Sequence, residues 1–289
     1  MEPKAIVGLG EALWDVFPER KALGGAPANF ARCVSQLGFK GCLVSAVGKD
    51  LLGKEILETL TEKKMNFLIE TVDYPTGIAQ VHLNAEGVAQ YEICKNSAWD
   101  NIPFTKRMED LALKCSAVCF GTLAQRNAAS RNAIRSFLEL VPKEAYKIFD
   151  VNLRQNFYSK EIVLQSLQYC NILKMNEEEV AEIARIFEIA GMTEREICLH
   201  LLKAYNLKFV IETKGAVGSY VFCDYETSYL EALKVPVTDT VGAGDSFIAA
   251  FAVALLRGET LQEAHKLAVK SAARTCSQRN AQNIPPLLH

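Results

Sequence analysis

The sequence has few histidines, no closely paired cysteines and no long apolar run. It contains four histidines and nine cysteines in 289 residues, and none of the cysteines forms a CxxC pair at zinc-ligand spacing, so a structural zinc site is not expected. The odd cysteine number and the lack of a secretory signal at Met1–Gly10 predict reduced thiols in the cytoplasm, packed as small apolar residues. No apolar run approaches the roughly 18 residues that a membrane span needs.

The chain also lacks a strong net charge. Its formal charge is −2 and its pI is about 6.2, which gives no general attraction to nucleic acid or to an anionic membrane. We therefore expect a small-molecule partner.

No internal repeat or linker divides the chain, so we expect one main domain over residues 1–289. Short apolar runs alternate with helical stretches, which is typical of an α/β fold whose mostly parallel sheet carries helices on both faces, a three-layer α/β/α sandwich. The expected strands are Ala5–Leu9, Gly41–Val47, Ala117–Gly121, Lys147–Val151, Ile172–Met175, Phe209–Thr213 and Gly218–Cys223. The expected helices are Ala26–Gln36, Gly53–Lys63, Ser130–Leu140, Glu177–Phe187, Glu194–Ala204, Asp245–Leu256 and Leu261–Thr275.

One segment departs from this alternation. Ile78–Leu83 and Val88–Ile93 alternate in polarity around the turn Asn84–Gly87, which predicts a β-hairpin. Such a hairpin could be a lid over a ligand, a contact between two copies of the chain, or a plain surface feature, and the pattern does not choose among these.

A glycine-rich turn precedes the helix predicted to begin near Asp245. Gly242, Ala243 and Gly244 lie at the helix N-terminus, where unpaired amides and the helix dipole favour an anion and glycine lets a phosphate approach the backbone. Asp245 could cap the helix, or it could take a proton from an alcohol while the amides hold the phosphate that the alcohol attacks.

The stretch Asp239-Thr-Val-Gly-Ala-Gly-Asp245 resembles the C-terminal signature of PfkB-type, ribokinase-like carbohydrate kinases. The resemblance implies ATP as cosubstrate and Mg2+ as cofactor. It further implies that Asp245 is the catalytic base and that Gly242, Ala243 and Gly244 form the anion hole. It also implies that Asp239 and Val241 help to hold a potassium-like cation. A small β-sheet lid formed by about residues 11–23 and 75–100 belongs to the same expectation.

A second motif lies near the other end of the chain. The segment Gly24-Gly-Ala-Pro-Ala-Asn29, with Gly10-Glu-Ala-Leu-Trp-Asp15 before it, is similar to the sugar-binding segments of fructokinases in this family. The resemblance implies that Asp15, Gly24, Gly25 and Asn29 bind the sugar. From the residues alone, Asp15 could instead be a turn residue before Phe17 and Pro18.

Three further segments match the family in chain order. Their resemblance implies sugar contacts for Asn152 and Arg154, and a nucleotide region that contains Asn176, Glu179, Thr213 and Gly215. An asparagine followed by acidic residues is also a common helix start, so the pair Asn176 and Glu179 has that ordinary alternative. Arg126 follows an expected strand end and could contact the transferred phosphate or the substrate, or be a surface arginine.

The segment Gly48–Glu55 matches the Walker pattern GxxxxGK except that Glu55 stands where a magnesium-binding Ser or Thr is needed. We interpret it as a loop followed by a helix start. Another departure is Asn280, where many family members have glycine, which leaves nearby cation and adenine contacts open.

The sequence thus predicts an ATP-dependent sugar kinase, with fructose favoured by the Gly24–Asn29 and Gly10–Asp15 segments. Ribose, 2-keto-3-deoxygluconate or a nucleoside would use the same scaffold. A sugar-binding regulatory protein without transferase activity is the alternative from another class, and a homodimer through the lid is a further possibility.

Overall fold

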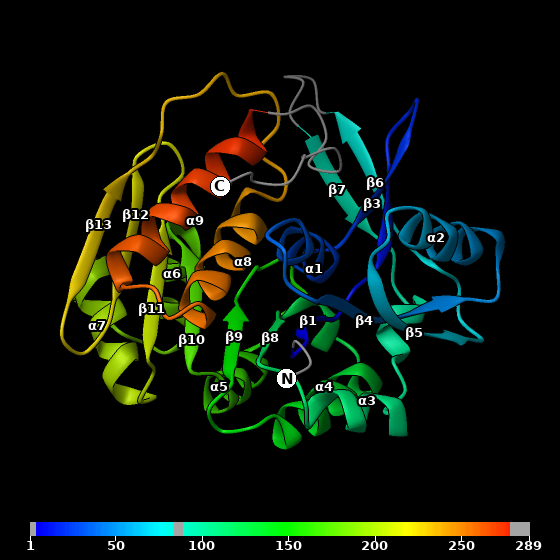
Figure 1. Cartoon of the computed structure of the whole chain (residues 1–289), viewed down its shortest axis with the longest axis horizontal. Coiled ribbons are helices and arrows are strands. Elements are labelled where there is room, and N and C mark those ends of the chain that lie inside the picture. The colour runs from blue at the N-terminus through cyan, green and yellow to red at the C-terminus, as the bar shows by residue number, and fades with distance from the viewer. Residues whose placement is uncertain (1–3, 84–88, 278–289) are drawn as a thin grey trace.

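A computed structural model describes residues 4–83 and 89–277 of the chain. A nine-stranded sheet runs through its centre, parallel except where β12 pairs with β11 and β13 (Figure 1). In spatial order its strands are β13 (Thr227–Glu231), β12 (Gly218–Phe222), β11 (Phe209–Thr213), β10 (Ile172–Asn176), β9 (Tyr146–Asp150), β8 (Ala117–Phe120), β1 (Ile6–Leu9), β4 (Gly41–Gly48) and β5 (Asn66–Val72).

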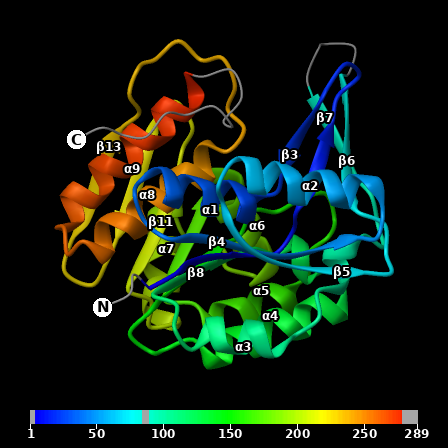
Figure 2. The same cartoon turned by 45° about the vertical axis from the view of Figure 1, so that its right-hand side comes forward.

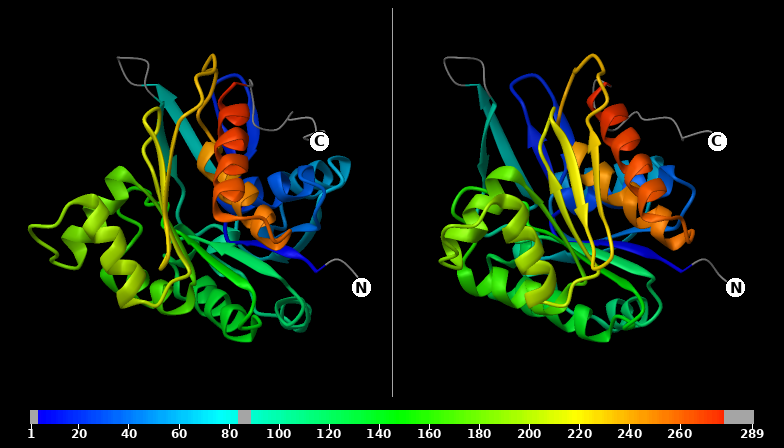
Figure 3. Two further views of the ribbon diagram at one scale, coloured as in Figure 1. Left: turned by 60° about the vertical axis from the view of Figure 1, so that its left-hand side comes forward. Right: turned by 90° about the vertical axis from the view of Figure 1, so that its left-hand side faces the viewer.

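Helices cover both faces of this sheet, which confirms the predicted three-layer α/β/α fold (Figure 3). On one face lie α1 (Ala26–Gln36), α2 (Leu51–Glu62), α8 (Ala243–Leu256) and α9 (Leu261–Cys276). On the other face lie α3 (Lys106–Ala112), α4 (Ala128–Leu140), α5 (Lys160–Tyr169), α6 (Glu177–Ile186) and α7 (Glu194–Ala204).

The central strands are apolar throughout because both faces of the sheet are buried. Successive side chains of a strand point to opposite faces: Ile6 packs with α1, α8 and α9, whereas its neighbour Val7 packs with the helices of the other face. All four residues of β1 and all eight of β4 are buried, as expected for a parallel sheet between helix layers.

A second, smaller sheet projects beyond the large one (Figures 1 and 2). Its strand order is β3 (Lys21–Gly24), β2 (Leu13–Val16), β6 (Gly77–Leu83) and β7 (Ala89–Ile93). The antiparallel pairing of β6 with β7 confirms the predicted hairpin, although its turn at Asn84–Gly87 lies outside the described residues. The small sheet therefore joins a segment near the N-terminus to the hairpin.

The Walker-like segment is a strand end followed by a helix start. The carboxylate of Asp50 caps α2 by accepting from the Gly53 amide at 2.8 Å and also from the amide and hydroxyl of Thr76. Lys54 points along the exposed side of α2 and pairs with Glu58. The segment thus stabilises the junction between the large sheet and β6.

The cysteines are thiols that lie mainly in the core. All nine cysteines are free, and seven of them are buried. Among the residues that the structure describes, none of the helices has the length and apolar character needed to cross a membrane.

Candidate active site

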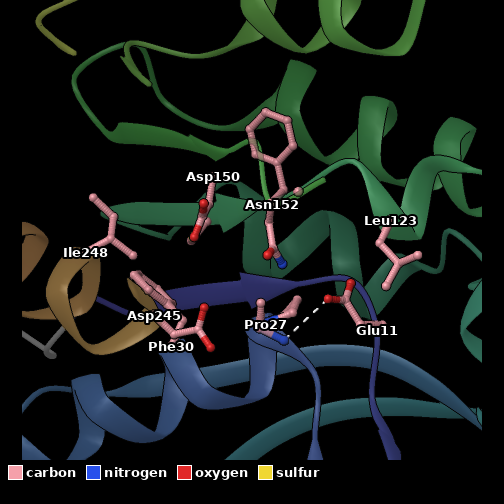
Figure 4. A pocket seen from close by; sticks show the side chains of 12 residues that line it. Glu11, Pro27, Phe30, Leu123, Asp150, Asn152, Asp245 and Ile248 are labelled. Carbon is pink, nitrogen blue, oxygen red and sulfur yellow. Dashed lines mark hydrogen bonds between the residues drawn. The ribbon is translucent and has the colours of Figure 1, made fainter. Parts of the chain in front are cut away.

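A small cavity lies where β1, β8 and β9 end and where α1 and α8 begin (Figure 4). Its volume of about 10 Å³ gives room for about one water molecule. Its polar lining comes from Glu11, Asp150, Asn152 and Asp245. The carboxyl edge of a parallel sheet is the usual ligand-binding edge of such folds, so the location agrees with the expected site.

Asp245 lies in the first turn of α8. Gly242 precedes the helix with φ 79°, in the left-handed region that glycine adopts readily. The Ala243 amide donates to the Thr240 carbonyl at 3.2 Å, so the anion-binding capacity of this turn comes from the remaining first-turn amides, which have no acceptor within the helix.

The Asp245 carboxylate accepts a hydrogen bond from the segment predicted to bind the sugar. Asn29 Nδ2 on α1 donates to Asp245 Oδ2 at 2.9 Å. Burial raises the pKa of Asp245 to about 6, and Asp150 adds to this rise, while Lys174 and the Asn29 hydrogen bond oppose it. A buried carboxyl group with a pKa near neutrality can act as a general base.

A buried ion pair lies beneath the turn. Lys174 on β10 is directly opposite Asp150 on β9 in the sheet register, and Lys174 Nζ lies 2.9 Å from Asp150 Oδ1. A β-carbon added at Gly244 would lie 2.9 Å from the same Nζ. Glycine therefore allows the anion-binding turn to approach a positive charge.

The sequence motifs do not point to Asp150, Lys174 or Glu11 as site residues. The available signal was a charged residue inside or directly after an otherwise apolar strand. Burial alone would lower the pKa of Lys174, but Asp150 and Glu179 raise it above its ordinary value, so this lysine stays charged.

The other predicted sugar-side residues surround the start of α1. Asp15 on β2 packs against Gly24, where a β-carbon would collide with its carboxylate, and burial raises the pKa of Asp15 to about 6. Gly25 has φ 106° and lies against the backbone of Glu11. The two glycines thus allow close packing between the end of β3, β2 and the segment after β1.

Asn152 and Arg154 follow β9. Asn152 has φ 43°, lines the cavity and points toward α1 in Figure 4. Arg154 is exposed and lowers the pKa of Glu11, Asp15 and Asp245 through its charge. Both residues therefore lie in the surroundings of Asp245, and their contact with a sugar stays a prediction.

Arg126 is not a surface arginine. Its side chain is 8% exposed, its guanidinium pairs with both oxygens of Asp100 at 2.7 and 2.8 Å, and it stacks between the rings of Trp99 and Phe157. It is absent from the cavity lining, and most of its donors are already engaged in the described structure.

The predicted nucleotide residues lie at neighbouring strand ends. Asn176 and Glu179 form a capping box at the start of α6, and the second Glu179 oxygen accepts from the Leu153 amide at 2.9 Å. Thr213 ends β11 and donates to the Met175 carbonyl, while Gly215 has φ 51° in the exposed turn before β12. The structure thus shows the helix-start arrangement that was the ordinary alternative for Asn176 and Glu179.

The candidate cation residues belong to the loop before α8. Asp239 Oδ1 accepts from the Val241 amide at 3.0 Å, and the Asp239 amide contacts the Cys276 carbonyl at the end of α9. Asn280 lies outside the described residues.

Comparison with known proteins agrees with this geometry. Residues 10–287 match the family model described as pfkB family carbohydrate kinase. A fructokinase of Escherichia coli is 28% identical over 260 residues, which cover 83% of this chain and 81% of the relative.

Solved structures show the same fold. A ribokinase II of Escherichia coli, in complex with ATP and Mg2+, has a TM-score of 0.81 and 20% identity, with 97% of this chain and 94% of the other covered. A double mutant of the Vibrio cholerae fructokinase, bound to fructose, ADP and potassium, has a TM-score of 0.80 and 20% identity, with 98% and 95% covered.

Proposed function

The chain belongs to the pfkB family of carbohydrate kinases, and on that premise we propose that Asp245 is the base with which this ATP-dependent sugar kinase activates its acceptor. The observation that carries the proposal is the position of Asp245. It is a carboxylate with a raised pKa at the N-terminus of α8, held by Asn29 and facing the buried pair of Lys174 and Asp150.

The reaction follows from this arrangement. As the sugar hydroxyl attacks the γ-phosphorus of ATP, Asp245 takes the hydroxyl proton, a new O–P bond forms, and the bond from phosphorus to the leaving ADP oxygen breaks. The first-turn amides of α8, with Gly242 and Gly244, hold the charge on the transferred phosphoryl group. Lys174 adds a buried positive charge under the same turn.

Magnesium, when bound with ATP, neutralises the phosphates. Across residues 4–83 and 89–277 the structure has no cluster of three acidic, histidine or cysteine side chains that could hold a metal ion, and backbone amides already occupy both Glu179 oxygens. The ion would therefore be held mainly by the nucleotide, with Glu179 and Asn176 acting through water. Thr213 and Gly215 would lie beside the nucleotide, and Asp239 and Val241 near a potassium ion.

Fructose is the acceptor that we favour. The Gly24–Asn29 and Gly10–Asp15 segments support it, as does the similarity to the Escherichia coli fructokinase. Asp15 would accept hydrogen bonds from the hydroxyl groups of fructose, Arg154 would donate to them, and Asn152 could do either. Ribose, 2-keto-3-deoxygluconate and nucleosides are the competing acceptors. Arg126 would support this region indirectly, through its contact with Phe157.

The small sheet would act as a lid. Asp15 is on β2, so movement of this sheet would bring a carboxylate to the sugar and exclude water from the transfer step. A contact between two copies through the same sheet is the second role that we consider for it.

The decisive test is a panel of sugars and nucleosides assayed with Mg-ATP, using the wild type and Asp245→Asn. We expect phosphorylation of fructose and a loss of kcat of at least about 100-fold in the variant, since general-base catalysis supplies about 10²–10⁴-fold. Lys54→Ala is the matched control, because Lys54 is exposed on α2 and pairs only with Glu58 among the contacts described. It should retain wild-type nucleotide binding and turnover.

Three outcomes would contradict the proposal. Wild-type turnover in Asp245→Asn would show that Asp245 is not the base. Loss of nucleotide binding in Lys54→Ala would favour a Walker-type site, and sugar binding without transfer to any acceptor would favour a regulatory protein.

A further inference from the structure

Glu11 is a buried acidic residue that has no place in the proposed mechanism. It follows β1 directly and is 3% exposed. Its Oε1 accepts from the Ala26 amide at 3.3 Å, whereas Oε2 is buried without a hydrogen-bond partner in the described part of the chain. A buried unpaired carboxyl oxygen is costly, so its retention calls for a physical reason.

The bonded oxygen stabilises the start of α1. The residue that precedes this helix, Gly25, has no side chain with which to cap it, and Glu11 satisfies the Ala26 amide from a different element. Three residues further along α1, Asn29 donates to Asp245. Glu11 is therefore connected to Asp245 through the first turn of one helix.

The unpaired oxygen belongs to the cavity that contains Asp245. Glu11, Asp150, Asn152 and Asp245 all line this cavity, and Figure 4 shows Glu11 and Asp245 on either side of Pro27, below Asn152 and Asp150. The cavity has room for about one water molecule and several polar groups to bind it.

We propose that Glu11 is a positioning residue for Asp245: it fixes the start of α1 and, through a water molecule in the shared cavity, places a second carboxyl group beside the base. This inference rests on the proposed role of Asp245.

The charges around the two carboxyl groups make the coupling measurable. Burial raises the pKa of Glu11 to about 7, and Asp245 raises it further while Arg154 opposes the rise. Asp245 itself faces Asp150 on β9, Lys174 on β10 and Arg154 after β9. The buried thiols Cys33 on α1 and Cys119 on β8 also face it, and burial raises the pKa of both thiols, so they stay neutral near pH 7.

Glu11→Gln separates charge from shape. Its amide oxygen can still accept from Ala26, but the side chain cannot ionise. The pKa of Glu11 is about 7 and that of Asp245 is about 6, so Glu11 is still largely protonated where Asp245 ionises, and its charge strengthens the base only above about pH 7. We expect the acid limb of the profile of kcat/KM against pH to stay in place near pH 6, and kcat at pH 8 to fall about 3–10-fold with KM for the sugar within about twofold.

Glu11→Asp provides the complementary change if the glutamine variant does not fold. It keeps an ionisable group in the cavity but shortens the reach to Ala26, so kcat should fall to the same extent below and above pH 7. Glu139→Gln is the control for net charge, because Glu139 is on α4 and bonded to Arg135 and Tyr169; its profile should match the wild type.

A Glu11→Gln profile that superimposes on the wild type would overturn the inference, as would a raised KM with unchanged kcat, which would make Glu11 a sugar ligand instead. Asp245→Asn is assayed in the same series. If that variant is inactive and Glu11→Gln behaves as the wild type, only the Glu11 role fails; if Asp245→Asn is active, the proposed base fails.

Discussion

Asn29 Nδ2 donates a hydrogen bond of 2.9 Å to Asp245 Oδ2, which joins α1 to α8 across 216 residues of sequence. The sequence motif predicts Asn29 as a sugar ligand, and the structure adds a contact to the proposed base. A donor to the ionised carboxylate favours that form and so lowers the pKa of Asp245.

Asn29→Leu removes this donor. We expect the pKa of Asp245 to rise above its wild-type value of about 6, so the acid limb of the profile of kcat against pH should move up by about 0.5–1 unit. The measurement is kcat at saturating sugar from pH 5 to 9, with thermal unfolding as a check on folding. An unmoved acid limb with a raised KM for the sugar would restrict Asn29 to substrate binding.

Asp245→Asn should stabilise the fold at alkaline pH. Burial raises the folded pKa of Asp245 from 3.8 to about 6, so between these values the folded state binds more protons than the unfolded state. Stability contributed by this group is therefore lost as pH rises from 4 to 6. The free energy of unfolding at pH 8 should rise by about 1–3 kcal/mol in the variant.

Urea unfolding at pH 4 and pH 8 checks this expectation, and the gain should vanish at pH 4. A helix-capping aspartate would behave in the opposite way, because its loss costs up to about 1 kcal/mol at neutral pH. The sign of the change thus separates the two roles that the sequence leaves open for Asp245.

The sequence predicts the large sheet well where burial is uniform. β1 and β4 are apolar throughout because both faces are covered, and the glycine turn marks the start of α8 by local chemistry alone. In contrast, β5 is an edge strand with mixed exposure and β2 has only four residues, so neither carries a strong periodic signal.

The charged centre of the site could not be predicted in the same way. Lys174 and Asp150 meet only because β10 and β9 are neighbours in a particular register, which no local pattern specifies. The orientation of Asn29 toward Asp245 and the packing of Arg126 against Asp100 depend likewise on tertiary contacts. Motif resemblance located these segments but not the contacts within them.

The stability of the fold should depend strongly on both members of the buried Lys174–Asp150 pair. Lys174→Met leaves the buried Asp150 carboxylate without its cation and should lower the free energy of unfolding by about 3–5 kcal/mol. The double variant Lys174→Met with Asp150→Asn removes both charges and should recover much of this loss.

Denaturant unfolding of the two single variants and the double variant gives the coupling free energy. Arg135→Met is the control, since its pair with Glu139 is exposed and should contribute far less to stability than the buried pair. Equal losses for the buried and the exposed pair would contradict the expectation.

His265 predicts a second pH dependence, far from the reaction. Its ring is buried between β12, β13 and α9, with Ser219 and Ser228 hydroxyls 2.8 Å from its two nitrogens. Burial lowers the pKa of His265 from 6.5 to about 4, so between these values the unfolded state binds the extra proton. Stability should therefore be complete above pH 6.5 and fall by up to about 3 kcal/mol as pH drops toward 4.

His265→Gln tests this dependence, because glutamine can replace part of the hydrogen bonding but does not titrate. We expect the variant to be less stable than the wild type at pH 7 through poorer packing against Phe247, yet to lose less stability between pH 6.5 and pH 4. The measurement is urea unfolding at half-unit intervals, with the exposed His200→Gln as control. If His265→Gln and the wild type lose stability in parallel, His265 is not the source of the acid sensitivity. The buried carboxyl groups of Glu11 and Asp245 cannot be its source either, because their raised pKa values make the folded state more stable as pH falls.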